Sequence, residues 1–155
     1  MSDLSDILND KAIDADMVAA NKKGLFQQLA TAAAKQTGLP AKEVAAALNA
    51  REKIGSTGFG GGTAIPHAKV EGLDRVVGYF ARLETPLDFQ SIDNMPVDLV
   101  FLLLSPVDAG AEHLKALARV SRIFRDAQTV AKLRGARSRD ALYALLAGGE
   151  ARDAA

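Results

Sequence analysis

The sequence predicts an α/β fold, a sandwich of helices around one β-sheet. Residues 76–83 and 97–104 are apolar and rich in β-branched side chains, which is typical of strands. Segments with apolar residues at helical spacing lie on both sides of them in the chain. A length of 155 residues favours one domain over residues 1–155, with a Gly- and Ala-rich tail at 148–155 that we expect to be frayed.

Two helices are predicted in the N-terminal third of the chain. Residues 22–35 carry apolar side chains at the spacing of an amphipathic helix. The residues at 38–40, Gly-Leu-Pro, interrupt this pattern. Pro40 suits the first turn of a second helix, which we expect to run to about Glu52.

The C-terminal half predicts two strands followed by helices. The second strand, at 97–104, is an almost unbroken apolar run, which favours burial on both faces. Ser105 and Pro106 end this strand, and Asp108 is a candidate cap for a long helix over about 109–126. Two shorter helices are predicted at about 127–134 and 138–146.

Composition and charge exclude several classes of protein. Lys plus Arg equals Asp plus Glu, at 19 each, so nothing indicates a nucleic acid or an anionic membrane as partner. The chain has no cysteine, which excludes disulfides, thiolate metal sites and cysteine nucleophiles. The N-terminus is acidic where a signal peptide would be basic, and the apolar run at 99–104 is too short to cross a bilayer. We therefore expect a cytoplasmic protein without membrane insertion.

The segment 55–70, GSTGFGGGTAIPHAKV, is the most informative part of the chain. It holds a dense cluster of glycines, each of which costs backbone entropy on folding. The cluster consists of Gly55, Gly58, Gly60, Gly61 and Gly62. The P-loop pattern is absent, because no lysine stands directly after Gly62. A dinucleotide-binding fingerprint is absent as well, because it would need glycine where Thr63 stands. A cluster of ordinary turns remains the simplest alternative.

His67, at the end of this segment, has the surroundings that a phosphohistidine requires. One ring nitrogen must be free as the nucleophile while a hydrogen bond holds the other. Successive backbone N–H groups of a glycine-rich loop can hold phosphoryl oxygens. Pro66 restricts the backbone next to the ring. We therefore expect a phosphoryl-binding loop made of Gly55, Ser56, Thr57, Gly58, Gly60, Gly61 and Gly62.

Two further polar residues lie on apolar helix faces. Arg51 shares a face with Val44 and Leu48 at the end of the second helix, and His113 shares one with Val120 near the start of the long helix. The helix N-terminus favours neutral His113, which could still donate to a phosphoryl oxygen.

Taken singly, each of these residues has an ordinary explanation. Arg51 could extend its charge into water, His113 could be a hydrogen-bonded core residue, and His67 could be a plain loop histidine. A two-histidine metal site completed by Glu112 or Asp108 lacks metal-ligand spacing. We predict no metal and no cofactor.

The chain resembles the IIA proteins of the fructose/mannitol type from the phosphoenolpyruvate-dependent phosphotransferase system, especially the nitrogen-regulatory branch. The resemblance covers about residues 5–147, which would form the core of the domain. Four segments carry it: Arg51-Glu52 before Gly55-Ser56-Thr57-Gly58, then Ala64-Ile65-Pro66-His67, then 97–106, and Glu112-His113-Leu114.

The resemblance implies a mixed β-sheet flanked by helices and a phosphocarrier function. His67 would accept a phosphoryl group from a phosphorylated HPr- or NPr-type carrier, itself supplied by enzyme I. His113 would be the second active-site histidine, Arg51 the nearby cation, and regulatory proteins the targets. Phe59, in the glycine-rich segment, is a candidate for contact with the carrier.

Two other functions remain open at this stage. A sugar-specific IIA would pass its phosphoryl group to a IIB protein that uses a cysteine, which this chain lacks. A free-standing IIA protein is compatible with regulation, although a separate IIB chain could still exist. A module that binds partners without being phosphorylated would have no chemical need for Arg51, His67 and His113 together.

Overall fold

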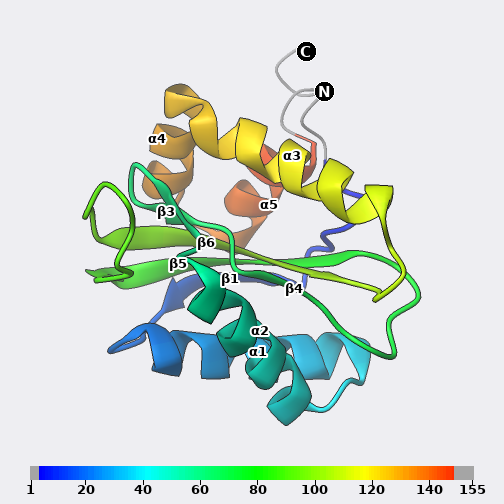
Figure 1. Ribbon diagram of the computed structural model, residues 1–155. Helices are drawn as coiled ribbons and strands as arrows, with labels where there is room; N and C mark the ends of the chain where they lie inside the picture. Colours follow the sequence, from blue (N-terminus) through cyan, green and yellow to red (C-terminus); the bar gives the residue numbers. More distant parts are fainter. Residues whose placement is uncertain (1–3, 149–155) are drawn as a thin grey trace.

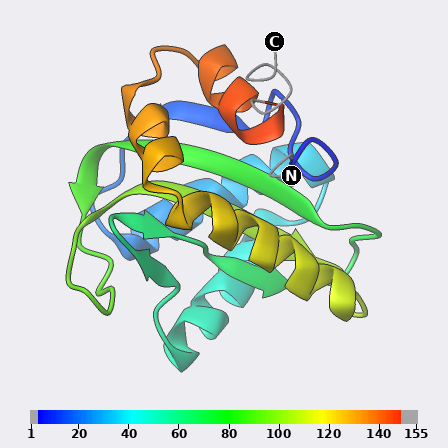
Figure 2. The same cartoon turned by 90° about the horizontal axis from the view of Figure 1, so that it is seen from above.

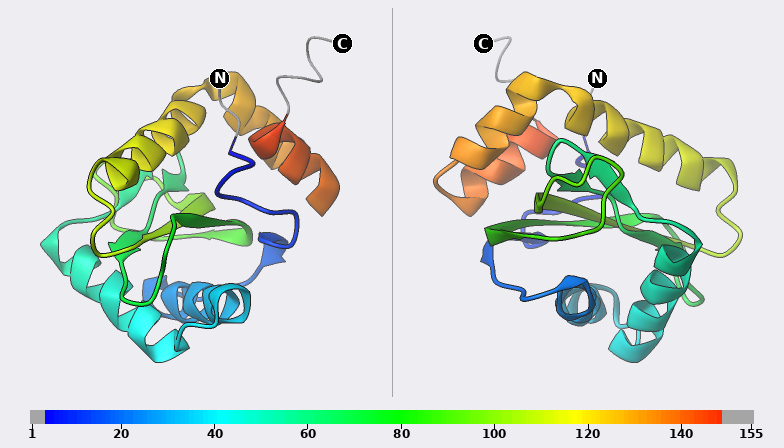
Figure 3. Two further views of the ribbon diagram at one scale, coloured as in Figure 1. Left: turned by 90° about the vertical axis from the view of Figure 1, so that its right-hand side faces the viewer. Right: turned by 60° about the vertical axis from the view of Figure 1, so that its left-hand side comes forward.

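A six-stranded sheet separates two layers of helices in the computed structural model, which describes residues 4–148 (Figure 1). The helices α1 (Lys22–Thr37) and α2 (Ala41–Ile54) cover one face. The other face is covered by α3 (Ala111–Arg125), α4 (Ala127–Gly135) and α5 (Arg139–Ala147). Figure 3 shows the same three layers from two sides. The predicted α/β sandwich is confirmed; apart from Gly148, the predicted frayed tail lies outside the described residues.

The sheet is mixed. Its strands lie in the order β1 (Ile13–Met17), β5 (Val77–Leu87), β6 (Val97–Ser105), β3 (Thr63–Ala64) and β2 (Gly58–Gly60), with β4 (His67–Lys69) also paired to β6. β5 and β6 are antiparallel, whereas β1 runs parallel to β5, and β3 and β4 run parallel to β6. The mixed sheet implied by the resemblance is therefore confirmed.

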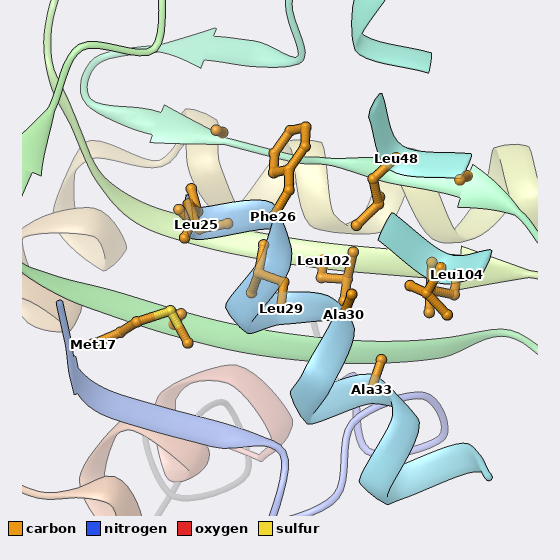
Figure 4. Close-up of a cluster of buried hydrophobic side chains, with 14 of the residues drawn as sticks. Met17, Leu25, Phe26, Leu29, Ala30, Ala33, Leu48, Leu102 and Leu104 are labelled. Atoms are coloured by element: carbon orange, nitrogen blue, oxygen red, sulfur yellow. The ribbon is translucent and has the colours of Figure 1, made fainter. Parts of the chain in front are cut away.

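β6 is buried on both faces, as its apolar run predicts. Odd-numbered residues from Leu99 to Leu103 belong to the core beneath α3–α5, and even-numbered residues from Val100 to Leu104 belong to the core against α1 and α2. This alternation follows from the two-residue period of a strand. Figure 4 shows Leu102 and Leu104 among the apolar side chains of α1 and α2. Burying each such leucine contributes about 1.5–3 kcal/mol, so β6 holds both helix layers in place.

The break between α1 and α2 has a clear local cause. Gly38 adopts a φ of 82°, a left-handed conformation that glycine reaches without strain, and its N–H donates to the carbonyl of Ala34. Pro40 is the N-cap of α2, immediately before the first turn in which it was predicted to lie. α2 ends at Ile54, so the glycine cluster begins immediately after it. Between residues 4 and 148, no helix is both long and apolar enough to span a membrane.

Two details differ from the sequence-based expectation. Asp108 does not cap α3: the helix begins after Gly110, which has a φ of 56° and makes no side-chain cap. The prediction was wrong because a glycine in a left-handed conformation delays the start of the helix. The short strands β1 to β4 were not predicted either, since runs of only two to five residues carry little strand signal.

Candidate functional site

Two histidines from distant parts of the chain meet at one end of β6. His67 is the first residue of β4 and lies opposite Leu103 of β6. His113 is in the first turn of α3, which follows β6 and lies across the sheet (Figure 2). The centroids of the two rings are 5.6 Å apart, and the ring planes are inclined by 50°.

The His67 ring is held in one tautomer. Its Nδ1 lies 2.7 Å from the carbonyl oxygen of Ile65. Because a carbonyl can only accept, Nδ1 carries the hydrogen and Nε2 keeps its lone pair. Burial lowers the pKa of His67, the hydrogen bond to Ile65 partly offsets this, and the charge of Arg51 lowers the pKa further while that of Glu52 raises it. His67 is therefore a neutral imidazole at pH 7, and its Nε2 carries a lone pair and no hydrogen.

His113 is buried, with 8% of its surface exposed. Its Nδ1 lies 2.6 Å from the hydroxyl oxygen of Ser105, the last residue of β6. Burial lowers the pKa of His113, and repulsion from His67 and Lys69 adds to the effect. The sequence led us to expect a neutral ring through the helix N-terminus; the direction agrees, but burial is the largest cause.

Arg51 lies in the last turn of α2 and is half-buried. Its Nη1 donates to the carbonyl of Gly55 at 2.9 Å, which satisfies a backbone acceptor at the end of the helix. Its charge also acts on His67, whose pKa it lowers. Arg51 therefore makes a structural contact at the helix end, and its charge also lies close enough to His67 to lower the pKa of that ring.

Glu52, next to Arg51, organises the start of the glycine-rich segment. Its carboxylate accepts the backbone N–H of Thr57 at 3.0 Å, the hydroxyl of Thr57 at 2.6 Å and the ammonium group of Lys22 at 2.8 Å. Only 9% of the Glu52 side chain is exposed. Such charge-assisted hydrogen bonds fix the path of the chain from α2 into the loop.

The predicted phosphoryl-binding loop is divided in two by the fold. Gly60, Gly61 and Gly62 have positive φ angles; Gly60 ends β2, and Gly61 and Gly62 connect it to β3. The carbonyl of Gly62 accepts from Leu99, whereas His67 lies opposite Leu103. Four residues of a strand span about 13 Å. The structure therefore does not bring these three glycines to His67.

Several backbone N–H groups of the loop already donate within the protein. The N–H of Thr57 donates to Glu52, that of Gly58 to the Ser56 hydroxyl, and that of Gly61 to Asp93. These three groups therefore do not form the predicted nest for a phosphoryl group. Of the predicted loop, Gly55 and Ser56 lie nearest in sequence to Arg51.

Exposed apolar side chains lie close in sequence to the polar residues of the site. Ile54 at the end of α2 is 82% exposed, Leu114 beside His113 is 67% exposed, and Val107 before α3 is 51% exposed. Phe59, our candidate for carrier contact, is instead half-buried in β2 and packs against the core on the α3 side. Exposed apolar side chains thus flank Arg51 and His113 in the chain, at the end of α2 and the start of α3.

A separate cleft of about 670 Å³ opens between α1 and the strand β1. Lys11, Gln28, Lys35 and Tyr79 are among its lining residues, and neither histidine lines it. The site formed by His67 and His113 is therefore distinct from this cleft.

Comparison with known proteins places the chain in a family. Residues 6–148 match the family described as "Phosphoenolpyruvate-dependent sugar phosphotransferase system, EIIA 2". The chain belongs to this family. EIIA type 2 proteins are components of that phosphotransferase system, and the resemblance stated from the sequence is confirmed at this level.

Its relatives include proteins of the nitrogen-regulatory branch. The chain is 47% identical to a nitrogen regulatory protein of Bradyrhizobium diazoefficiens, over 93% of this chain and 94% of the relative. It is 42% identical to a nitrogen regulatory protein of Escherichia coli (strain K12), over 92% and 88% of the two chains. The crystal structure of the nitrogen regulatory protein IIA-Ntr from Neisseria meningitidis superposes with a TM-score of 0.88 at 35% identity, over 92% of this chain and 98% of that one.

Two residues of the site escaped the sequence analysis as functional side chains. Ser105 was interpreted only as the end of a strand, although a lone polar residue after six consecutive buried apolar ones was a usable signal. Glu52 was noted as part of a motif, but its contacts with Thr57 and Lys22 depend on tertiary packing.

Proposed function

We propose that this EIIA type 2 protein is a phosphocarrier of the nitrogen-regulatory kind. His67 accepts a phosphoryl group on Nε2 from a phosphorylated HPr- or NPr-type carrier, and the phosphorylation state changes how the protein binds regulatory targets. One observation carries the proposal: the Nδ1–H of His67 is held at 2.7 Å by the Ile65 carbonyl, which leaves Nε2 free beside a second histidine ring.

The transfer step requires no proton transfer within the protein. A bond forms between Nε2 of His67 and phosphorus while the nitrogen–phosphorus bond of the donor's phosphohistidine breaks. The donor ring keeps the electron pair of the broken bond, and the hydrogen of His67 stays on Nδ1. Phosphoryl transfer of this kind depends on positioning and electrostatic stabilisation.

The surroundings of His67 supply both. Arg51 brings a positive charge that acts on this ring, and His113 lies within reach of a group bound to Nε2. The first turn of α3 has no side-chain cap, and the N-terminus of a helix attracts negative charge. Ile54, Val107 and Leu114 offer an apolar rim for docking of the carrier.

Two alternatives are tested along with the proposal. A sugar-specific IIA would donate to a separate IIB protein, and a binding module would not be phosphorylated at all. The nitrogen regulatory relatives favour regulation over sugar transport. The combination of Arg51, His67 and His113 favours a phosphocarrier over a binding module.

The decisive experiment is incubation with phosphoenolpyruvate, enzyme I and an HPr-type carrier, followed by intact mass measurement. We expect an acid-labile phosphoryl adduct on the unmodified protein and none on His67→Ala. His113→Ala should still be phosphorylated, but roughly tenfold or more slowly, because transition-state stabilisation by one hydrogen-bond donor is worth at least 1.4 kcal/mol.

The outcomes separate the three functions. No adduct with a carrier that phosphorylates a known EIIA protein would leave only the binding module. An adduct that is passed rapidly to a IIB protein would favour the sugar-specific alternative. An unchanged rate in His113→Ala would remove His113 from the mechanism.

A further inference from the structure

The hydrogen bond between Ser105 and His113 determines what His113 can do. Both residues are buried, and Ser105 has no exposed surface. The hydroxyl oxygen of Ser105 and Nδ1 of His113 are 2.6 Å apart, a distance that leaves room for one hydrogen between them. Either the hydroxyl donates to Nδ1, or Nδ1–H donates to the hydroxyl oxygen. The two arrangements leave Nε2 with opposite properties.

Burial decides between them. Among residues 4–148, the hydroxyl of Ser105 has no hydrogen-bond partner besides His113. If Nδ1–H were the donor, the hydroxyl hydrogen of Ser105 would be buried without an acceptor, which costs about 1–3 kcal/mol. If the hydroxyl is the donor, its hydrogen is satisfied and the lone pair of Nδ1 is satisfied as well. The second arrangement is therefore favoured.

We propose that Ser105 donates to Nδ1 of His113 and so fixes the neutral tautomer with its hydrogen on Nε2, from which His113 donates to a phosphoryl oxygen on His67. The inference rests on the proposed phosphocarrier function. Ser105 is a positioning residue in this scheme, because it acts through His113 and does not touch the phosphoryl group.

The two histidines would then have complementary tautomers. The Ile65 carbonyl places the hydrogen of His67 on Nδ1, so its Nε2 is a nucleophile. Ser105 places the hydrogen of His113 on Nε2, so this nitrogen is a donor. A carbonyl can only accept, whereas a hydroxyl can also donate, and this difference assigns opposite roles to two chemically identical rings.

The location of Ser105 explains how its hydroxyl is aimed. It is the last residue of β6 and pairs with Lys69 of β4, two residues after His67. Its carbonyl accepts the N–H of Val70 at 2.8 Å, so the backbone of Ser105 is fixed on the β4 side. The same pair of strands thus holds the ring of His67 and the hydroxyl that orients His113.

Nitrogen-15 NMR of the unphosphorylated protein tests the tautomer directly. We expect hydrogen on Nδ1 for His67 and on Nε2 for His113 in the same spectrum. In Ser105→Ala, the signals of His113 should shift toward a mixture of tautomers while those of His67 stay unchanged. Hydrogen on Nδ1 of His113 in the unmodified protein would overturn the proposal.

Transfer kinetics test the consequence. Ser105→Ala should slow phosphorylation of His67 by the HPr-type carrier about tenfold, since an oriented donor is lost. Ser105→Thr keeps the hydroxyl and should restore most of the rate. Ser91→Ala is a matched control, because Ser91 is also buried but its hydroxyl has no hydrogen-bond partner among residues 4–148. The phosphorylation rate of this variant should not change.

A double-mutant comparison separates positioning from a general structural effect. If Ser105 acts through His113, Ser105→Ala should cause no further loss of rate in a His113→Ala protein. An equal loss in both backgrounds would overturn the proposal. If no variant, nor the unmodified protein, is phosphorylated, the proposed function fails, and the tautomers measured by NMR still decide whether Ser105 fixes His113.

Discussion

At the scale of single residues, the pKa of His67 is influenced by two charges of opposite sign at neighbouring positions, besides burial. Arg51 and Glu52 are consecutive in α2, and both act on the pKa of His67. Arg51 disfavours the imidazolium and Glu52 favours it, although burial remains the largest influence. The neutral form of His67 at pH 7 is therefore a balance that single substitutions should shift in either direction.

We expect Arg51→Gln to raise the pKa of His67 and Glu52→Gln to lower it. The first change removes a repulsion from the imidazolium, and the second removes an attraction. NMR titration can follow the two histidines of this chain separately. Lys132→Gln on α4 is the control and should leave the pKa of His67 unchanged. A shift in the same direction for both test variants would contradict this account of the site.

At the scale of elements, the glycine-rich segment packs against the loop between β5 and β6. The hydroxyl of Ser56 donates to the carbonyl of Phe89 at 3.3 Å, and the N–H of Gly61 donates to Asp93 at 2.8 Å. Both partners lie between β5 and β6. Part of the glycine content therefore serves close packing between these two loops, away from His67.

Gly58 and Gly55 provide a matched test of this packing. A Cβ at Gly58 would lie 2.1 Å from the hydroxyl oxygen of Ser91 and 3.1 Å from its Cα, whereas a Cβ at Gly55 would meet nothing within 4 Å. We expect Gly58→Ala to lower the free energy of unfolding by about 1–3 kcal/mol through overpacking. Gly55→Ala should be nearly neutral because its φ of 169° suits any residue.

Urea denaturation of both variants measures the difference. Equal stabilities would mean that the loop between β5 and β6 moves away from the added methyl group at little cost. That result would contradict the close packing of the two loops.

At the scale of the whole molecule, the exposed apolar residues fall into two groups, near the proposed site and away from it. The first group is Ile54, three residues after Arg51 in α2, Val107 between β6 and α3, and Leu114 next to His113. The second group is Val18, between β1 and α1, and Ile92 and Met95, in the loop between β5 and β6. Ile92 is 93% exposed and Leu114 is 67% exposed. Only the first group borders the proposed site, so the two groups should differ in their contribution to carrier binding.

We expect Leu114→Asp to raise the KM for the phosphorylated carrier about tenfold with little change in kcat. A loss of about 1.4 kcal/mol, which buried apolar contact of this size can supply, corresponds to that factor. Ile92→Asp is the matched control and should keep the KM. Phosphoramidate is a small phosphoryl donor that needs no docking surface, so it should phosphorylate both variants at the same rate. A slower reaction with phosphoramidate in Leu114→Asp alone would mean that the substitution impairs phosphoryl transfer itself and not docking of the carrier.

The pH dependence of stability is also a property of the whole molecule. The pKa values of His67 and His113 are both lowered from 6.5 by burial, so the folded protein binds fewer protons than the unfolded chain. The free energy of unfolding should therefore be highest above pH 6.5 and fall as the pH drops toward the lowered pKa values. The hydrogen bond to Arg119 lowers the pKa of the Asp6 carboxyl group. The stability that this carboxylate contributes is therefore lost only below about pH 4.

Urea titrations at pH 7, 6 and 5 check this direction. The His67→Gln/His113→Gln protein should lose less stability between pH 7 and 5 than the unmodified protein does. An equal loss of stability between pH 7 and 5 in both proteins would mean that groups other than the two histidines cause the pH dependence.

Much of the fold and part of the site were predictable from the sequence. The five helices and the two long strands follow from periodicity and apolar runs, because these signals are local and repeat over eight or more residues. The resemblance pointed to His67, His113 and Arg51. The functional assignment of all seven loop residues to one phosphoryl-binding site did not fit the geometry, because strand pairing carries Gly60–Gly62 away from His67.

The sequence by itself determined the layers and the family, and it pointed to His67 as the candidate phosphoryl acceptor. Only the tertiary structure decided which hydrogen-bond partner each histidine has: the Ile65 carbonyl for His67 and the Ser105 hydroxyl for His113. The reason is physical. Helix and strand formation depend on neighbours within a few positions, whereas a tautomer depends on an atom within 3 Å, brought there by the pairing of β4 with β6 and the return of α3.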